Sequence, residues 1–159
     1  HRGATRASSG GMANLIDTLN DLIAVCHDSE EGFGKAAKGC HAETLRHRFI
    51  GIARQRSDFA DELAGQVRAL GGEPATQAHE SSVLHEGWRQ LEESIRPKDD
   101  VSLLVECLRG EENTLRHYEH ALTRTDLPVA VRPVIDRQRL AVQEALLELR
   151  SVEMVRRAG

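Results

Sequence analysis

Four polar residues interrupt otherwise apolar helical stripes, each near the middle of a long segment. They are Glu30, Arg56, Glu111 and Gln138. Burial of an unpaired charge is costly, so charges at core positions are usually paired or bound to a ligand. The planar guanidinium of Arg56 can bridge two carboxylates, and the Gln138 amide can donate to a remaining oxygen. We therefore predict that these residues converge as a buried polar cluster.

The alternative chemistry is a carboxylate site for iron or manganese, with Glu30 and Glu111 as ligands. Ferritin-like di-iron proteins take one Glu from each of two helices and a Glu-x-x-His pair from each of the other two. Glu30 and Glu111 match the lone glutamates in that pattern. Further ligands close to them in sequence are His27, Glu31 and Glu112.

Both Glu-x-x-His pairs are missing from the chain. Arg56 is followed three residues later by Phe59, and Gln138 is followed by Ala141. Arg56 also brings a positive charge to the place where metal cations would have to bind. We therefore expect no ferroxidase centre, no catalytic residue and no cofactor, and we keep a divergent iron- or manganese-binding oxidoreductase as the alternative.

Apolar residues recur at spacings of three and four, which predicts helices that must position these side chains. The expected helices cover residues 14–39, 45–70, 80–96, 100–122 and 131–152. No segment alternates with a period of two, so a sheet is not expected. Short loops join the first pair and the last pair of long helices, while a long link holds the short helix. This pattern predicts an all-α, ferritin-like four-helix bundle of two hairpins joined by a crossover; a five-helix array is the alternative.

Capping and breaking residues predict where the helices start and stop. Asn14 is a candidate N-cap for the first helix, and Asp99 or Asp100 for the helix that follows the crossover. Gly71 and Gly72 should end the second helix. Pro133 predicts either a kink in the last helix or a delayed start.

The two ends of the chain and the cysteines carry less information. Residues 1–11 are polar and rich in Gly and Ser, which suggests an expression scar or a disordered tail before one domain over residues 12–159. The three cysteines are odd in number and lack CxxC spacing. We expect them to be reduced and partly buried.

Composition excludes several functional classes. Only 3% of the residues are aromatic and the formal net charge is −4, which argues against stacking on nucleic-acid bases and against binding phosphates. No apolar run approaches the roughly 20 residues needed to cross a bilayer. A cytoplasmic protein is therefore expected, with no nucleic-acid or membrane partner.

Some apolar residues lie off the main stripes of the first hairpin. They are Ile16, Ile23, Val25 and Ile50. A second apolar face on this hairpin would favour a homodimer or another protein partner.

Six segments together resemble a bacterial domain-of-unknown-function family of ferritin-like four-helix-bundle proteins. They are LNDLIAVCHDSEEGFGKAA, RQRSDFADEL, LGGEP, HEGWRQL, CLRGEENTLRHYEHAL and LPVAVRPVIDRQ. The resemblance covers about residues 14–150 and includes the four polar positions and Tyr118. It implies the ferritin-like fold and no established activity. Many relatives carry a histidine in the last helix near the position of Leu146, and its absence here argues further against metal chemistry.

These observations together predict a non-catalytic cytosolic module with a structural, interaction or stress-associated role.

Overall fold

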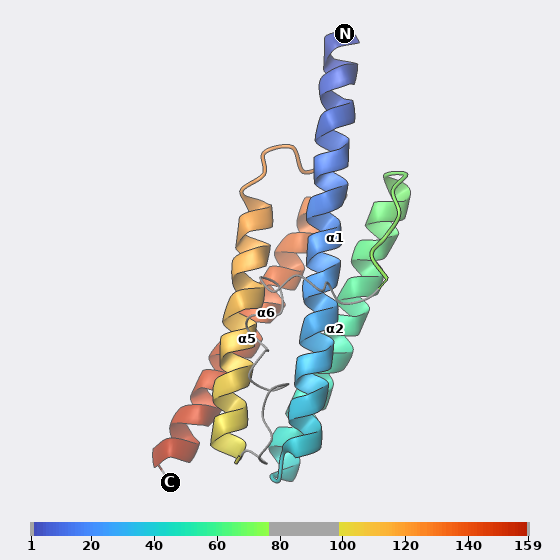
Figure 1. The fold of residues 1–159 in the computed structure, drawn as a ribbon. Coiled ribbons are helices and arrows are strands. Elements are labelled where there is room, and N and C mark those ends of the chain that lie inside the picture. Colours follow the sequence, from blue (N-terminus) through green and yellow to red (C-terminus); the bar gives the residue numbers. More distant parts are fainter. Residues whose placement is uncertain (1, 77–98, 159) are drawn as a thin grey trace.

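The computed structural model describes residues 2–76 and 99–158, and within these ranges the chain forms four helices and no strand (Figure 1). The helices are α1 (Arg2–Gly39), α2 (Glu43–Ala69), α5 (Asp100–Leu122) and α6 (Arg132–Ala158). The predicted all-α class is confirmed. The helix predicted over residues 80–96 lies outside the described residues.

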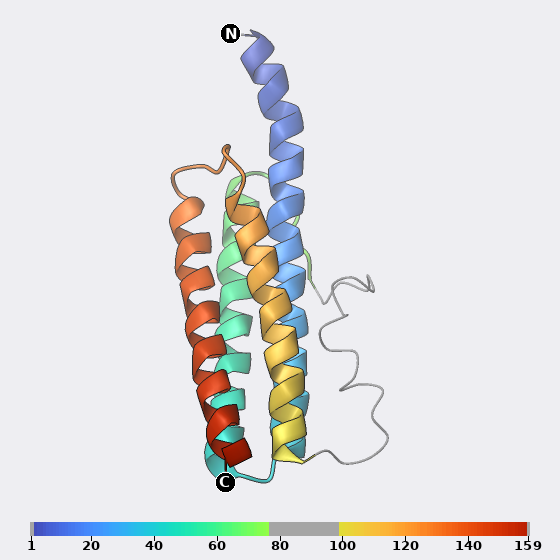
Figure 2. The ribbon, with the colours of Figure 1, turned by 90° about the vertical axis from the view of Figure 1, so that its left-hand side faces the viewer.

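The helices form two antiparallel hairpins packed side by side, as the stripes predicted (Figures 1 and 2). α1 pairs with α2, α5 pairs with α6, and α1 packs against α5. α2 and α6 form the fourth side of the bundle and pack less extensively than the other three neighbouring pairs. α2 and α5 run parallel, which is the arrangement that a crossover between two hairpins requires. Within the described ranges, no helix combines the length and apolarity needed for a membrane span.

Three of the predicted helix boundaries are confirmed. α2 ends at Ala69, and Gly71 follows with a φ of 84°, a left-handed conformation that favours glycine. The Asp99 carboxylate accepts a hydrogen bond from the Ser102 amide and caps α5. Pro133 is the second residue of α6, so the last helix has the delayed start and not a kink.

The predicted start of the first helix is wrong, because Asn14 lies inside α1 and not at its N-terminus. The Asn14 carbonyl oxygen also accepts a hydrogen bond from the Thr18 hydroxyl, 3.0 Å away. Met12 and Ala13 are good helix formers, so nothing in the local sequence forces the helix to begin at Asn14. The interpretation of residues 1–11 as an added tail stays a prediction.

The core of the described residues consists of two large apolar clusters stacked along the bundle axis, and Ala24 and Val25 form a third, small one. The first large cluster includes Leu19, Leu63 and Ile135, and the second includes Phe33, Phe49 and Leu149. Side chains with polar groups from all four helices lie near the middle of the bundle, where these clusters meet. We call this set the polar layer; its members are Cys26, Ser29, Arg56, Glu111, Thr114, Tyr118 and Gln138.

Asp100 of α5 binds the backbone just before the first turn of α2. Its carboxylate accepts hydrogen bonds from the backbone amides of His41 at 2.8 Å and Ala42 at 2.9 Å. Ala42 is the N-cap of α2 and its own side chain cannot cap. A carboxylate near a helix N-terminus also interacts favourably with the helix dipole. Asp100 therefore holds the loop between α1 and α2 against the start of α5.

Replacing Asp100 with Ala should lower the free energy of unfolding by about 1.5–3 kcal/mol, the usual effect of losing hydrogen bonds to a charged group. Burial alone would raise the pKa of Asp100, but the His41 and Ala42 amides outweigh it, so the pKa lies below its ordinary value. A lowered folded pKa stabilises the fold above the unfolded pKa of about 3.9, and this stabilisation is lost as pH falls through the folded pKa. Urea unfolding should therefore show a difference between wild type and variant that shrinks below about pH 3.9. A difference that persists unchanged into that range would contradict a role of the Asp100 carboxylate in holding this loop.

Candidate functional site

An ion pair between Arg56 of α2 and Glu111 of α5 crosses the centre of the bundle. Both side chains have an exposed fraction of 0%. The two terminal nitrogens of Arg56 donate to the two oxygens of Glu111, each at 2.5 Å. This two-pronged geometry is the strongest form of a protein ion pair, because both hydrogen bonds are charge-assisted. It joins two helices that lie diagonally across the bundle.

The remaining surface of the guanidinium is also occupied. The Nε of Arg56 donates to the Gln55 side-chain oxygen at 3.3 Å. The guanidinium carbon lies 5.9 Å from the centroid of the Phe33 ring, within the range of a cation–π contact. Burial alone would lower the pKa of Arg56, but the adjacent Glu111 carboxylate outweighs it and the pKa is raised. Arg56 is therefore a permanent cation whose neutralising charge is Glu111.

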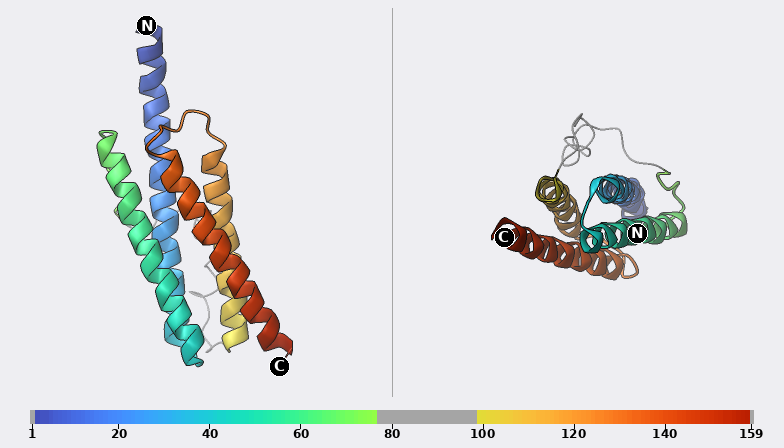
Figure 3. Two further views of the ribbon diagram at one scale, coloured as in Figure 1. Left: turned by 180° about the vertical axis from the view of Figure 1, so that it is seen from behind. Right: turned by 90° about the horizontal axis from the view of Figure 1, so that it is seen from below.

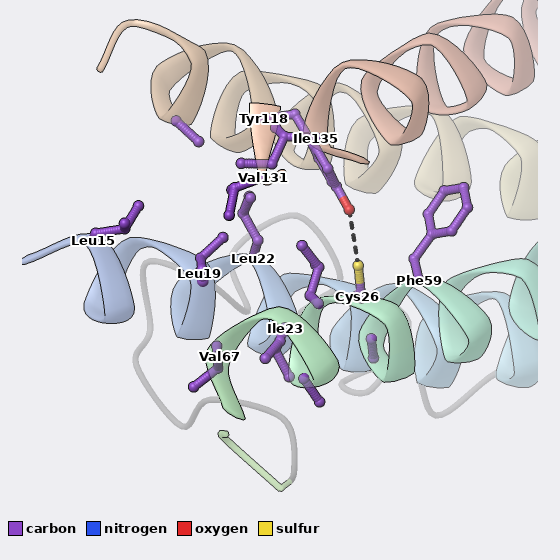
Figure 4. Close-up of a cluster of buried hydrophobic side chains, with 14 of the residues drawn as sticks. Leu15, Leu19, Leu22, Ile23, Cys26, Phe59, Val67, Tyr118, Val131 and Ile135 are labelled. Carbon is purple, nitrogen blue, oxygen red and sulfur yellow. Dashed lines mark hydrogen bonds between the residues drawn. The ribbon is translucent and has the colours of Figure 1, made fainter. Parts of the chain in front are cut away.

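A second set of hydrogen bonds centres on the Tyr118 hydroxyl. It donates to the side-chain oxygen of Gln138 at 2.6 Å and lies 3.2 Å from the Cys26 sulfur (Figure 4). Because the hydroxyl hydrogen is directed to Gln138, the Cys26 thiol acts as the donor toward Tyr118. Burial raises the pKa of Tyr118 well above its ordinary value, with a further contribution from the adjacent Cys26. The phenol and the thiol therefore stay protonated and serve as hydrogen-bonding groups.

The amide nitrogen of Gln138 continues this set of hydrogen bonds toward the surface. It donates to the Glu62 carboxylate at 2.9 Å and to the Phe59 carbonyl oxygen at 3.4 Å. Glu62 in turn forms an ion pair with Arg137 on the bundle surface. Both ends of the buried Gln138 amide are thus satisfied, as a polar group in a core requires.

Ser29 of α1 and Thr114 of α5 complete the polar layer. Their hydroxyl oxygens are 3.0 Å apart, and Thr114 also donates to the Gly110 carbonyl oxygen at 3.0 Å. With its hydrogen directed to Gly110, the Thr114 hydroxyl accepts from Ser29. This contact joins α1 to α5 with neutral groups.

Glu30 does not belong to the buried polar cluster, and that part of the sequence prediction is wrong. Its side chain has an exposed fraction of 43%, and its carboxylate lies 3.5 Å from the His27 imidazole. Successive helix residues are rotated by about 100°, so Ser29, one position earlier, takes the inward place. Glu30 lines a surface groove of about 630 Å³ between α1 and α2, together with Gly34 and Ile50.

Glu31 and Glu112, the further ligands considered for a metal site, also lie on the surface. Glu31 pairs with Lys35 at 3.0 Å, and Glu112 pairs with Arg150 at 2.7 Å. Over residues 2–76 and 99–158, no group of three or more His, Cys, Asp and Glu side chains is placed to hold a metal ion. The two oxygens of Glu111 already accept from Arg56. The residues that the structure describes therefore do not fit the di-iron centre that a ferritin-like fold suggests.

Sequence reasoning missed several members of the polar layer and several buried charges. Cys26 and Tyr118 were on the predicted stripes, but their hydrogen bond could not be read from spacing. Ser29 and Thr114 were not predicted, because a small hydroxyl residue does not clearly mark or interrupt an apolar stripe. Asp28 and Glu106 are also buried, with exposed fractions of 3% and 5%.

The thiols should be unreactive in the folded protein. All three cysteines are free and buried. Burial raises the pKa of Cys26 to about 11, and it raises that of Cys107 well above its ordinary value. Because the thiolate is the reactive form, a thiol reagent at pH 8 should modify the native protein far more slowly than the urea-unfolded protein. Rapid modification of native Cys26 would contradict its burial beside Tyr118.

Comparisons with known proteins agree with this architecture. A solved structure described as a dodecameric thioferritin, the bacterioferritin-related protein from Bacteroides fragilis, superposes with a TM-score of 0.76. The identity is 17%, and the match covers 99% of this chain and 95% of that chain. At this identity the similarity shows the ferritin-like fold alone, which confirms the predicted architecture. A comparison with curated protein sequences gives no match.

The family comparison covers α2 and α5 and most of α1. Residues 14–124, more than half of the chain, match the family described as Domain of unknown function (DUF2383). The matched range contains both partners of the buried ion pair. By this match, the ferritin-like chain belongs to the DUF2383 family.

Proposed function

We propose that this protein is a non-catalytic ferritin-like module in which a buried ion pair takes the place of a di-metal centre. The Arg56–Glu111 pair is the observation that carries the proposal. Both oxygens of Glu111 accept from Arg56, and the guanidinium places a positive charge where a metal cation would have to bind. The polar layer then fixes which helices meet and at what height, and the outer surfaces of the bundle bind partners.

A buried ion pair is better evidence for this structural role than for a large contribution to the free energy of unfolding. Removal of two charges from water costs several kcal/mol per ion, and a well-packed apolar pair of similar volume is often equally stable or more stable. What a polar layer adds is specificity, because an out-of-register helix would leave Arg56 or Glu111 unpaired. Such a role for buried polar groups is known in some helical assemblies.

Thermal unfolding with added metal tests the proposal. A ligand that binds only the folded state at a hundred times its Kd adds about 2.7 kcal/mol of stability. We expect no rise in the melting temperature with Fe²⁺ under anaerobic conditions or with Mn²⁺. The control is Glu111→Gln, which removes the carboxylate of the buried ion pair. A metal-dependent rise in the wild type that disappears in Glu111→Gln would contradict the proposal.

A further inference from the structure

The surface groove between α1 and α2 has the size of a small-molecule site. Seen from behind, these two helices run side by side along one edge of the bundle (Figure 3). Gly34 and Ala37 line the groove from α1, and Ile50 and Ala53 line it from α2. Its volume of about 630 Å³ lies within the range of pockets that hold small ligands, and such pockets have mainly apolar walls.

The broad apolar face predicted on the first hairpin is wrong. Ile23 and Val25 are buried, with exposed fractions of 0% and 2%. Ile16 and Ile50 are partly buried and pack against the two large core clusters. Of these four residues, Ile50 lines the groove. The first hairpin therefore offers a groove to a ligand and not a flat surface to a second helix.

Gly34 keeps the groove open. It lies inside α1, where glycine is less favourable than alanine because it loses more conformational freedom on folding. Among the described residues, no atom lies within 4 Å of the position that a Cβ would take at Gly34. Close approach of another helix therefore does not explain this glycine. A larger side chain at this position would instead occupy the space of the groove.

The charged residues of the groove are distributed unevenly along its length. Lys38 in the last turn of α1 and Arg46 near the start of α2 lie at the end next to the loop between these helices. Glu30 and Arg54 carry opposite charges further along, and Asp58 lies at the other end. This distribution favours a ligand with one negative charge at the end that contacts Lys38 and a neutral remainder.

Lys38 is the cation at this end that is best placed to bind a ligand. Arg46 already donates to the Cys40 carbonyl oxygen at 2.5 Å and to the Glu43 carboxylate at 3.4 Å. Lys38 is exposed, and within residues 2–76 and 99–158 it forms no ion pair. Its ammonium group can therefore bind a carboxylate without first breaking another ion pair.

We propose that the groove binds a medium-chain fatty acid, with its carboxylate at Lys38 and its chain along Gly34, Ile50 and Ala53. From Lys38 to Glu30 the groove follows α1 for about 12 Å at 1.5 Å per residue. The chain removes the apolar walls from water, and each fully buried CH₂ group tightens binding by up to about fourfold. This site is separate from the Arg56–Glu111 pair, so it does not depend on the proposed function.

Titration calorimetry of the full chain with decanoate, below its critical micelle concentration, tests the site. We expect one molecule bound per chain, with weaker binding of octanoate. Gly34→Leu fills the groove and should raise the Kd at least about tenfold. The matched control is Gly65→Leu on α2, where an added Cβ also meets no described atom within 4 Å but lies outside the groove. This control should bind decanoate as the wild type does, and circular dichroism confirms that both variants fold.

The position of the head group is tested with Lys38→Gln and with 1-decanol, which has a similar chain and no charge. Lys38→Gln should raise the Kd for decanoate by about two- to fivefold, the usual range for an exposed ion pair, and should leave that for decanol unchanged. Lys35→Gln, one turn earlier on α1, should have no effect on either Kd. The proposal is overturned if decanoate shows no saturable binding, if Gly34→Leu weakens binding no more than Gly65→Leu, or if decanol binds as tightly as decanoate.

Discussion

Replacing Arg56 with Met should lower the free energy of unfolding by about 3–5 kcal/mol, because Glu111 is then left as an unpaired charge in the centre of the bundle. Urea unfolding at pH 7 measures this difference. The matched control is Glu30→Gln, which changes a half-exposed glutamate and should cost less than about 1 kcal/mol. A loss below about 1 kcal/mol for Arg56→Met would mean that the pair is not buried.

The double variant Arg56→Met with Glu111→Leu distinguishes the loss of the ion pair from a loss of packing at the same two positions. Both charges are removed together, so no unpaired group remains, and an apolar pair of similar volume is often as stable as the ion pair. We expect the double variant to be more stable than either single variant. Simple addition of the two single losses would contradict a direct interaction between the side chains.

Tyr118→Phe should lower the free energy of unfolding by about 1–3 kcal/mol. The substitution removes the hydroxyl that donates to Gln138, so a buried amide oxygen loses its donor, while the ring still fills the same space. Urea unfolding again gives the measurement. The same substitution in a Gln138→Leu background should cost less, because no amide oxygen is then left unsatisfied. An equal loss in both backgrounds would contradict the hydrogen bond.

Much of the fold could be predicted because its signals are periodic and local. The apolar stripes determine which residues face the core, and Gly71, Asp99 and Pro133 mark helix ends through backbone chemistry that any fold would respect. The start of α1 could not be predicted from Asn14, since a good N-cap residue is also tolerated inside a helix when the residues before it favour helix.

The polar layer was harder to predict because its contacts join residues that are far apart in sequence. The spacing of the apolar residues indicated that Arg56, Glu111 and Gln138 face inward. It could not show that Arg56 pairs with Glu111, or that Gln138 accepts a hydrogen bond from Tyr118. The prediction for Glu30 was wrong because the inward position on the α1 stripe belongs to Ser29, one residue earlier. A polar residue next to a small inward residue such as Ser29 can shift the apparent phase by about 100°.

The metal content of the purified protein tests most directly whether the ion pair takes the place of a metal centre. The chain would be expressed without a histidine tag in medium supplemented with iron and manganese, desalted, and measured by plasma mass spectrometry. The Arg56–Glu111 pair predicts far less than one metal ion per chain. One equivalent or more, lost on Glu111→Ala but kept on Glu30→Gln, would contradict it.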